Sequence, residues 1–237
     1  MTPAIAFRAV SHSFGAHSVL SEVTLEIGRG EIYGLAGANG SGKTTLLRAA
    51  AGAIRPAGGS IQVMGTTGYV AQKFGMYEDL LVEENLRFFA RCHGLSGAEL
   101  ETAVDRVVGR FGLAGRLRTP AGFLSHGWKQ RLAIASALCH RPTALILDEA
   151  TSGIDLATRF EIWELLVEFA RDGVGIVLAT HDTEELSRCD RIGYLQGGRL
   201  IVSGTAGEVR ALCGEGLGRE PESLTAALAW FARGAGR

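Results

Sequence analysis

The sequence predicts an α/β fold with a mostly parallel sheet, a small antiparallel β-subdomain and an inserted helical subdomain. A phosphate-loop pattern, GxxxxGK[ST], occupies residues 37–44 between a short apolar run and a helix-forming stretch. Apolar runs at 143–150 and 174–181 flank another helical stretch, which is the alternation of strand and helix found in parallel sheets. Residues 76–140 carry successive helical patterns instead, and we expect them to form the inserted subdomain.

The composition fits one large domain or a domain with an inserted lobe. The chain has 237 residues and a formal net charge of -1, so the overall charge does not support nucleic-acid binding, and any phosphate affinity must be local. The longest uncharged run, 56–72, is rich in Gly, Thr and Ser and fails as a spanning helix. If the protein works at a membrane, another chain must supply the membrane part.

The N-terminus and the cysteines indicate a reduced, cytosolic protein. The first ten residues, MTPAIAFRAV, lack the basic and apolar segments of a secretory signal. The cysteines are too far apart for a disulfide framework or a metal-ligand pattern: Cys92, Cys139, Cys189 and Cys213. Two of them precede a histidine, and isolated Cys-His dipeptides are typical of half-buried helix residues, so no metal site is predicted.

Two strands are predicted near the N-terminus. Residues 4–14 and 19–27 alternate in polarity and are separated by the turn-like GAHS. Together with residues 59–65 they form the small antiparallel sheet. Phe14 ends the first strand, where an aromatic side chain either belongs to the core or stacks on a nucleobase, and the pattern alone favours the core.

The phosphate loop has the context that its pattern requires. Residues 31–36 are as short and apolar as a buried strand, and strong helix formers follow from about Lys43. Glycines let the backbone wrap around a polyphosphate, and the N–H groups at the helix start point at the same anion. Lys43 reaches the β- and γ-phosphates, and Thr44 offers a hydroxyl to Mg²⁺. The alternative is a chance turn in a chain with 33 glycines, and the flanking strand and helix argue against it.

The helical subdomain follows a strand. Residues 68–74 read as a strand that runs into a loop carrying Gln72, and residues 82–94 then form a helix with an acidic first turn and Gly94 as its stop. Residues 98–112 form a second, amphipathic helix. Its apolar stripe consists of Leu100, Val104, Val107 and Phe111.

In the second half of the sequence, the pattern predicts a helix that begins near Gly127 and ends before Pro142, and another helix at 156–173. Residues 191–204 are expected to form a hairpin around two adjacent glycines. The tail, 205–237, is expected to form helices with a frayed Gly/Arg end.

Polar side chains stand where two buried strands end. Asp148 and Glu149 follow four apolar residues, and the carboxyl end of a strand is where open α/β sheets place ligands. Asp148 can hold Mg²⁺, and Glu149 can take a proton from or orient an attacking water; the alternative is a solvated acidic pair. His181 follows the next strand, where it is either a surface residue or a donor to a transferring phosphoryl group.

Five motifs carry a family resemblance, and they occur in family order: GANGSGKTT, VAQ, LSHGWKQR, LILDEATSGID and ATHD. With them the chain resembles the ATP-binding subunit of an ABC transporter over nearly its whole length. The resemblance implies a P-loop NTPase core of the ABC ATPase type, in a single domain over 1–237. Residues 1–75 and 141–213 would form the catalytic core with the β-subdomain, 76–140 the helical subdomain, and 214–237 a C-terminal tail.

The resemblance also implies roles for single residues, with ATP and Mg²⁺ as ligands. Phe14 would stack on adenine, Gln72 would sense Mg²⁺, Asp148 would hold the metal with Thr44, and Glu149, His181 and Lys43 would be catalytic. The phosphate loop would be Gly37, Ala38, Asn39, Gly40, Ser41, Gly42, Lys43, Thr44 and Thr45.

A second subunit is implied for the signature segment. Ser125, His126, Gly127 and Asp155 would bind the ATP of a partner in a head-to-tail dimer that encloses two ATP molecules. Histidine replaces the first glycine of the usual LSGGQ. The side chain of His126 turns to solvent, which we favour, crowds the site, or donates to the γ-phosphate. Trp128 and Ala150 also depart from common family residues, without removing a functional group.

Residues 69–95 resemble the subfamily that works with ABC-2-type permeases, including bacterial multidrug exporters. This implies export through a separate membrane permease, a homodimer, and a cytoplasmic position peripheral to the inner face of the cell membrane. Phe74, Met76 and Tyr77 either line the permease groove or belong to the core. The alternatives are an importer subunit, a soluble ABC ATPase without a transport role, and a module that holds ATP without turnover.

Overall fold

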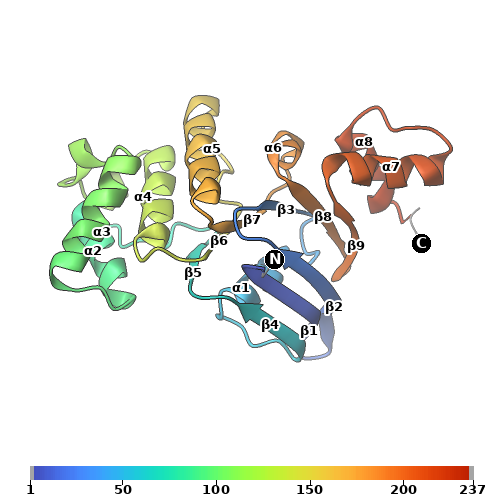
Figure 1. Cartoon of the computed structure of the whole chain (residues 1–237), viewed down its shortest axis with the longest axis horizontal. Helices are drawn as coiled ribbons and strands as arrows, with labels where there is room; N and C mark the ends of the chain where they lie inside the picture. Colours follow the sequence, from blue (N-terminus) through green and yellow to red (C-terminus); the bar gives the residue numbers. More distant parts are fainter. Residues whose placement is uncertain (1–2, 235–237) are drawn as a thin grey trace.

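The larger sheet runs through the middle of the molecule (Figure 1). The computed structural model describes residues 3–234. In spatial order the strands are β5 (Thr67–Val70), β6 (Ala144–Asp148), β7 (Gly175–Ala179), β3 (Ile32–Ala36), β8 (Arg191–Gln196) and β9 (Arg199–Gly204). In this order each strand is parallel to the next from β5 to β8, and β9 is antiparallel to β8. The predicted mostly parallel sheet is confirmed.

The small sheet is antiparallel, in the order β2-β1-β4, as expected. Its strands are β1 (Ile5–Phe14), β2 (His17–Ile27) and β4 (Gly58–Val63). Phe14 pairs with His17, so the turn between β1 and β2 is shorter than the predicted GAHS. This pairing extends the hairpin and brings both ring side chains to its tip.

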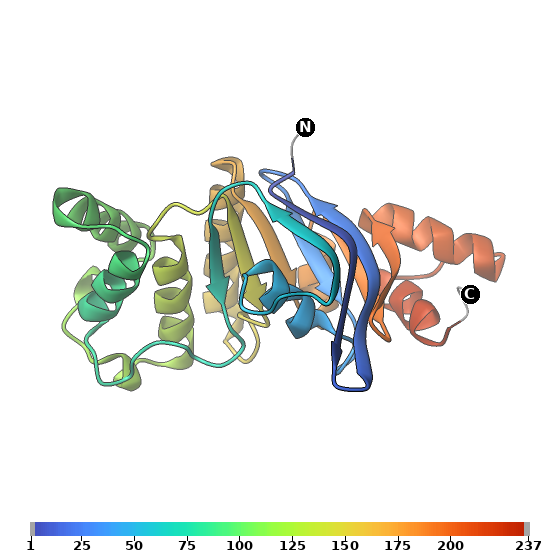
Figure 2. The same cartoon turned by 90° about the horizontal axis from the view of Figure 1, so that it is seen from below.

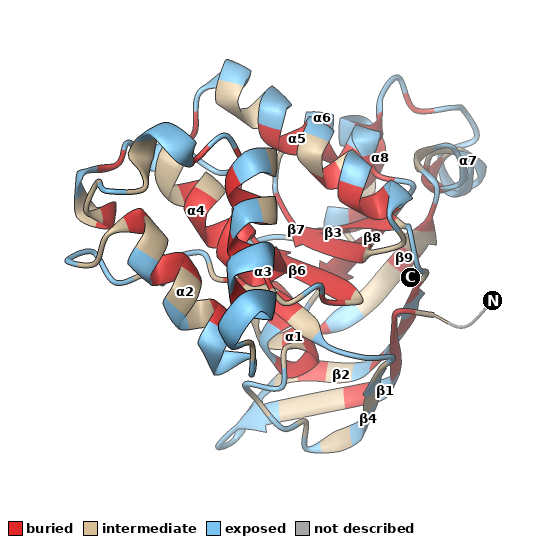
Figure 3. Ribbon diagram, turned by 60° about the vertical axis from the view of Figure 1, so that its left-hand side comes forward, coloured by how far each residue is buried: buried red, intermediate tan, exposed pale blue. Residues whose placement is uncertain are grey.

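The larger sheet separates two hydrophobic cores. On β6, Leu145 and Leu147 join the core shared with the helical lobe, whereas Ala144 and Ile146 join the core beneath α1 (Lys43–Ala50) and the small sheet. Successive side chains of a strand point to opposite faces, so a strand covered on both faces must be apolar throughout. Figure 3 shows the central strands buried along their length.

Helices α2 (Val82–Cys92), α3 (Gly97–Arg110) and α4 (His126–Leu138) form a lobe at one end of the molecule (Figures 1 and 2). The predicted stripe of α3, from Leu100 to Phe111, is buried as expected. Helix α4 also packs against β5, which joins this lobe to the larger sheet. Two short 3₁₀ turns, at Ala114–Arg116 and Ala121–Phe123, link α3 to α4.

The remaining helices lie in the second half of the chain. They are α5 (Leu156–Arg171), α6 (Thr183–Arg188), α7 (Ala206–Leu217) and α8 (Leu224–Ala232). Helix α1 ends at Ala50, earlier than its composition suggests, because Gly52 takes a left-handed conformation with φ 76°. Helix α7 runs across the position 213/214 at which the sequence places the start of the tail, and the extreme Gly/Arg end, 235–237, lies outside the described residues.

Two segments that are distant in sequence meet where α2 and α4 end. The rings of His93 and His140 stack with centroids 3.5 Å apart. His140 Nε2 also lies 3.1 Å from the carbonyl oxygen of Thr67. The preceding cysteines are not both half-buried as expected, because Cys92 is exposed and Cys139 is buried.

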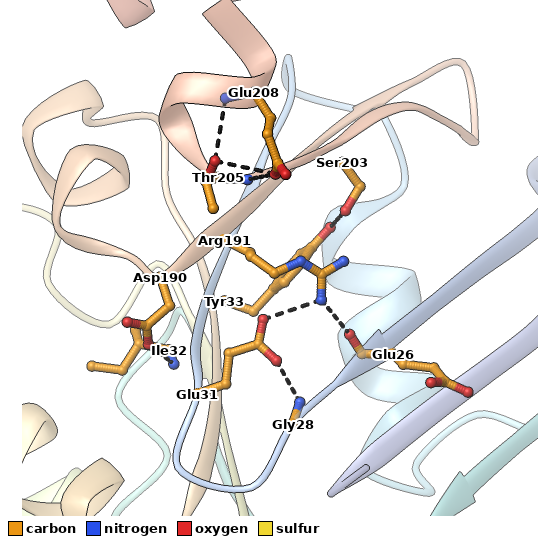
Figure 4. Close-up of polar contacts among 10 residues, drawn as sticks. All are labelled: Glu26, Gly28, Glu31, Ile32, Tyr33, Asp190, Arg191, Ser203, Thr205 and Glu208. Atoms are coloured by element: carbon orange, nitrogen blue, oxygen red, sulfur yellow. Dashed lines mark hydrogen bonds and ion pairs between the residues drawn. The ribbon is translucent and has the colours of Figure 1, made fainter. Parts of the chain in front are cut away.

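A polar cluster joins the two sheets near the start of β3 (Figure 4). Arg191 Nη1 lies 3.2 Å from Glu31 Oε1 and donates to the carbonyl oxygen of Glu26 at 3.3 Å. Tyr33 is buried beside them, and its hydroxyl lies 2.8 Å from Ser203 Oγ. Burial raises the pKa of Tyr33 to about 12. The cluster therefore ties β2 to β3, β8 and β9.

Within residues 3–234, no helix combines the length and apolar character needed to cross a membrane.

Candidate active site

The ends of four neighbouring parallel strands meet at one edge of the larger sheet. The segment 37–45 follows β3, Gln72 follows β5, Asp148 ends β6 and Glu149 comes directly after it, and His181 follows β7. All of these except Asp148, which is buried, contribute to the lining of a cleft of about 780 Å³. The predicted residues that line it are Phe14, Gly37, Ala38, Asn39, Gly40, Ser41, Gly42, Lys43, Thr44, Thr45, Gln72, Glu149 and His181. Parallel strands bring their carboxyl ends to a common edge, which explains the convergence.

The loop 37–45 needs glycine where its backbone passes close to neighbouring strands. Gly42 has φ 106°, and a Cβ there would lie 2.8 Å from the carbonyl oxygen of Val19. A Cβ on Gly37 would lie 2.3 Å from the carbonyl oxygen of Leu195. Helix α1 starts directly after Gly42, so its free N–H groups face the cleft and favour an anion there.

Lys43 folds back over the loop. Its Nζ donates to the carbonyl oxygens of Gly37 at 2.7 Å and Ala38 at 3.2 Å. Burial lowers the pKa of the amine, and the carboxylates of Glu149 and Asp148 act in the opposite direction. The ammonium group is thereby held at the floor of the cleft, where a phosphate oxygen can replace the carbonyls.

Thr44 and Asp148 form an oxygen pair beneath the loop. Thr44 Oγ1 donates to Asp148 Oδ1 at 3.1 Å, and the Tyr69 hydroxyl donates to the other carboxylate oxygen at 3.4 Å. Burial raises the pKa of Asp148, while the bond from Thr44 opposes the rise. A hydroxyl beside a carboxylate is the kind of ligand set that Mg²⁺ prefers, and a cation would offset the burial of the charge, so the donor set fits this metal.

Glu149 and Gln72 contact each other across the cleft. Gln72 Nε2 donates to Glu149 Oε2 at 2.9 Å. Glu149 has φ 53°, which is rare for a residue with a side chain, and its N–H donates to the carbonyl oxygen of Ala179 at 3.1 Å. The left-handed turn directs the backbone away from β6 directly after Asp148, so the two adjacent carboxylates occupy different surroundings.

His181 is exposed to the cleft, and its neighbours on both sides are firmly held. Thr180 Oγ1 donates to buried Glu185 at 2.5 Å and accepts from the N–H of Asp182 at 3.0 Å. Asp182 also pairs with Arg159 of α5 at 2.6 Å. The segment that carries His181 is thus braced by α5 and α6.

Phe14 is not a core residue, so the prediction from the strand pattern alone is wrong. Its side chain is 55% exposed and lines the cleft. The long β1–β2 hairpin extends beyond the core, and there the ring of Phe14 packs edge-on against the ring of His12 with the centroids 4.7 Å apart. His17 and Val19 also line the cleft and were not predicted from the sequence. The sequence offers one signal for them, because they stand at the start of the strand that pairs with the end of β1, where Phe14 lies.

Asp148 is buried beneath the loop, outside the lining of the cleft. Four further predicted site residues do not line the cleft of their own chain: Ser125, His126, Gly127 and Asp155. They lie where α4 and α5 begin, and a Cβ on Gly127 would meet Thr158 Cγ2 at 2.7 Å. His126 is exposed, as the favoured prediction of a side chain turned to solvent has it, and its Nε2 also lies 3.0 Å from the carbonyl oxygen of Ser152.

Comparisons with known protein sequences show which family the chain resembles. A family model described as "ABC transporter" matches residues 20–152. A probable multidrug ABC transporter ATP-binding protein of Escherichia coli (strain K12), YbhF, is 38% identical over 216 residues, which cover 86% of this chain and 37% of the relative. The Nod factor export ATP-binding protein I of Cupriavidus pinatubonensis is 37% identical, over 86% of this chain and 67% of that one. The chain therefore spans little more than a third of the first relative.

Solved structures extend the similarity to the fold. An ATP-binding subunit of an ABC transporter superimposes with a TM-score of 0.85 at 30% identity, over 96% of this chain and 98% of that one. A dimeric post-hydrolysis state of the ATP-binding cassette MJ0796, bound to ADP and Pi, has a TM-score of 0.77 at 25% identity, over 85% and 98% of the two chains. The roles predicted for single site residues stay predictions.

Proposed function

The chain belongs to the ABC transporter family, and we propose that it is the ATP-binding and ATP-hydrolysing subunit of a transporter that drives export through a separate, ABC-2-type membrane permease. One observation carries the ATPase part of the proposal. The phosphate loop, Glu149 and His181 follow three neighbouring parallel strands and line one cleft, with Asp148 buried beside Thr44 at the end of the same strand that leads to Glu149.

Each residue has a role that its surroundings support. The loop N–H groups and Lys43 would bind the phosphates, and Phe14 would stack on the adenine. Glu149 would accept a proton from the attacking water, and Gln72, bonded to it, would help to orient its carboxylate. His181 would donate to the oxygens of the transferring phosphoryl group, where negative charge develops.

Thr44 and Asp148 would hold Mg²⁺, with Gln72 nearby. Bound there, the ion would neutralise charge on the β- and γ-phosphates. Their oxygens are already 3.1 Å apart, so the protein supplies this pair without rearrangement.

A second copy of the chain would complete the site. Ser125 begins α4 without using its hydroxyl as a cap, and the first N–H groups of this helix are free to bind an anion. Because this helix start does not line the cleft of its own chain, we assign it to the nucleotide of a head-to-tail partner. ATP would then close the dimer, and hydrolysis would release it.

One feature supports export, and a second supports contact with a permease. The relatives described above are named for multidrug transport and Nod factor export. In the helical lobe, Tyr77 is 52% exposed and packs edge-on against partly exposed Phe88, with centroids 4.9 Å apart. Phe74 and Met76 instead pack against the core. The exposed aromatic pair would contact the permease and hold the subunit at the inner face of the membrane.

The test begins with purified protein. We expect Mg²⁺-dependent ATP hydrolysis that Glu149→Gln abolishes while ATP-bound dimers accumulate on size exclusion, because the variant still binds ATP but lacks the proton acceptor. ATP binding without turnover would contradict an enzyme. In membranes with the permease, efflux that fails with Glu149→Gln supports export, uptake would indicate an importer, and activity indifferent to any permease would favour a soluble ATPase.

A further inference from the structure

His126 begins α4, but its side chain contacts the turn that follows β6. Its Nε2 lies 3.0 Å from the carbonyl oxygen of Ser152. A carbonyl oxygen only accepts hydrogen bonds, so Nε2 carries the proton and donates it. A Cβ on Gly153 would lie 3.7 Å from the same nitrogen, so the ring also covers the residue after Ser152.

The turn that His126 contacts contains Glu149. The N–H of Ser152 donates to the carbonyl oxygen of Glu149 at 3.1 Å, which closes the turn 149–152. Within it Glu149 has φ 53°, a conformation that residues with side chains keep only when their surroundings impose it. A bond to the last carbonyl of the turn therefore helps to hold the first residue of the turn in place.

A close packing contact sets the distance between α4 and this segment. Gly127 lies so near Thr158 that a Cβ would come within 2.7 Å of Thr158 Cγ2. The N–H of Thr158 is in turn bound by Asp155 Oδ1 at 3.0 Å, at the start of α5. With the two helix starts held this closely, a histidine at position 126 reaches Ser152, whereas the glycine of the usual signature has no side chain to do so.

We propose that His126 is a positioning residue: within one subunit it ties the turn 149–152, and with it the Glu149 carboxylate, to the start of α4. The catalytic consequence rests on the proposed function, in which Glu149 accepts a proton, but the tether itself does not. Loss of the tether lets the turn open more often and misplaces the carboxylate. It lowers kcat and leaves the KM for ATP unchanged, because the phosphate loop is not involved.

Two readouts on the full chain test the tether. In the absence of nucleotide, His126→Ala should increase hydrogen exchange in a peptide covering residues 149–155 about fivefold, the usual effect of one lost hydrogen bond. His126→Gln, whose amide nitrogen reaches about as far as Nε2, should stay within about twofold of the unchanged protein. Ser152→Ala is the matched control for exchange, because it keeps the carbonyl group that His126 binds. His126→Gly provides a second variant without the donor if His126→Ala folds poorly.

In steady-state ATP hydrolysis, His126→Ala should lower kcat about fivefold at constant KM, with recovery in His126→Gln. Unchanged exchange in His126→Ala and His126→Gly would overturn the tether. A raised KM and fewer ATP-bound dimers at constant kcat would overturn it as well, because His126 would then act on the partner's nucleotide. A wild-type protein that hydrolyses no ATP refutes the proposed function alone, since the exchange measurement still decides for or against the tether.

Discussion

Protonation of His140 is expected to destabilise the protein as the pH falls from 7 to 5. The ring is half-buried where α2 and α4 end, stacked 3.5 Å from His93, and its Nδ1 is buried without a hydrogen-bond partner within residues 3–234. Burial, and secondly the neighbouring His93, lowers the pKa of His140 from 6.5 to about 4. Because the folded pKa lies below the unfolded one, the stability that the neutral ring provides is present above pH 6.5 and is lost as the pH falls toward 4.

The size of the loss follows from the two pKa values. At pH 5 an unfolded chain protonates this histidine and the folded chain mostly does not, which corresponds to about 2 kcal/mol of lost stability. Part of the ring faces solvent, and screening by water reduces the expected loss to about 1 kcal/mol. His140→Gln keeps an amide nitrogen within reach of the Thr67 carbonyl oxygen and does not titrate.

The assay is urea unfolding of the unchanged protein and of His140→Gln at several pH values between 7 and 5, followed by tryptophan fluorescence. The unchanged protein should lose about 1 kcal/mol more than the variant over this range. Since burial is the largest cause, the difference should persist at high salt, which screens charge pairs. Parallel stability curves for the two proteins would refute the reasoning.

Three further predictions concern the site. Thr180→Val removes a hydroxyl that bonds Glu185 and a backbone N–H, so urea unfolding should show a loss of about 2 to 3 kcal/mol, and a loss below about 0.5 kcal/mol would contradict it. Arg159→Leu breaks the partly exposed ion pair with Asp182 and should lower the free energy of unfolding by about 1 kcal/mol in the same assay. In a protein that already carries Asp182→Asn, Arg159→Leu should have no additional effect, and additive losses would refute the pairing. Phe14→Ala should weaken ATP binding about fivefold in a titration while leaving unfolding unchanged, because the ring is 55% exposed; equal affinity would argue against stacking on the base.

Sequence patterns predicted local structure correctly where one short segment determines its own conformation. The loop 37–45 carries its own glycines and helix start, so its conformation could be predicted from spacing. The strand 143–150 could be recognised because a strand covered on both faces has to be apolar, and its acidic end marks the ligand edge of the sheet. The α3 stripe could be recognised from its period.

Partners that come from distant segments could not be predicted in this way. Phe14 has the pattern of a core residue, but its hairpin extends beyond the core and leaves it exposed. His93 and His140 meet only because α2 and α4 end side by side. A sequence pattern indicates whether a side chain is expected to be buried, but it does not indicate which distant element covers that side chain.

The sequence by itself determined the phosphate loop, the paired carboxylates, the alternation of strand and helix, and through them the family. These features depend on residues that are neighbours in the chain, where backbone geometry and side-chain period act directly. Only the tertiary structure decided that Gln72 contacts Glu149, that Arg159 braces the segment beside His181, and that His126 binds Ser152. Those contacts join separate elements, and their distances are set by how the helices pack against the sheet.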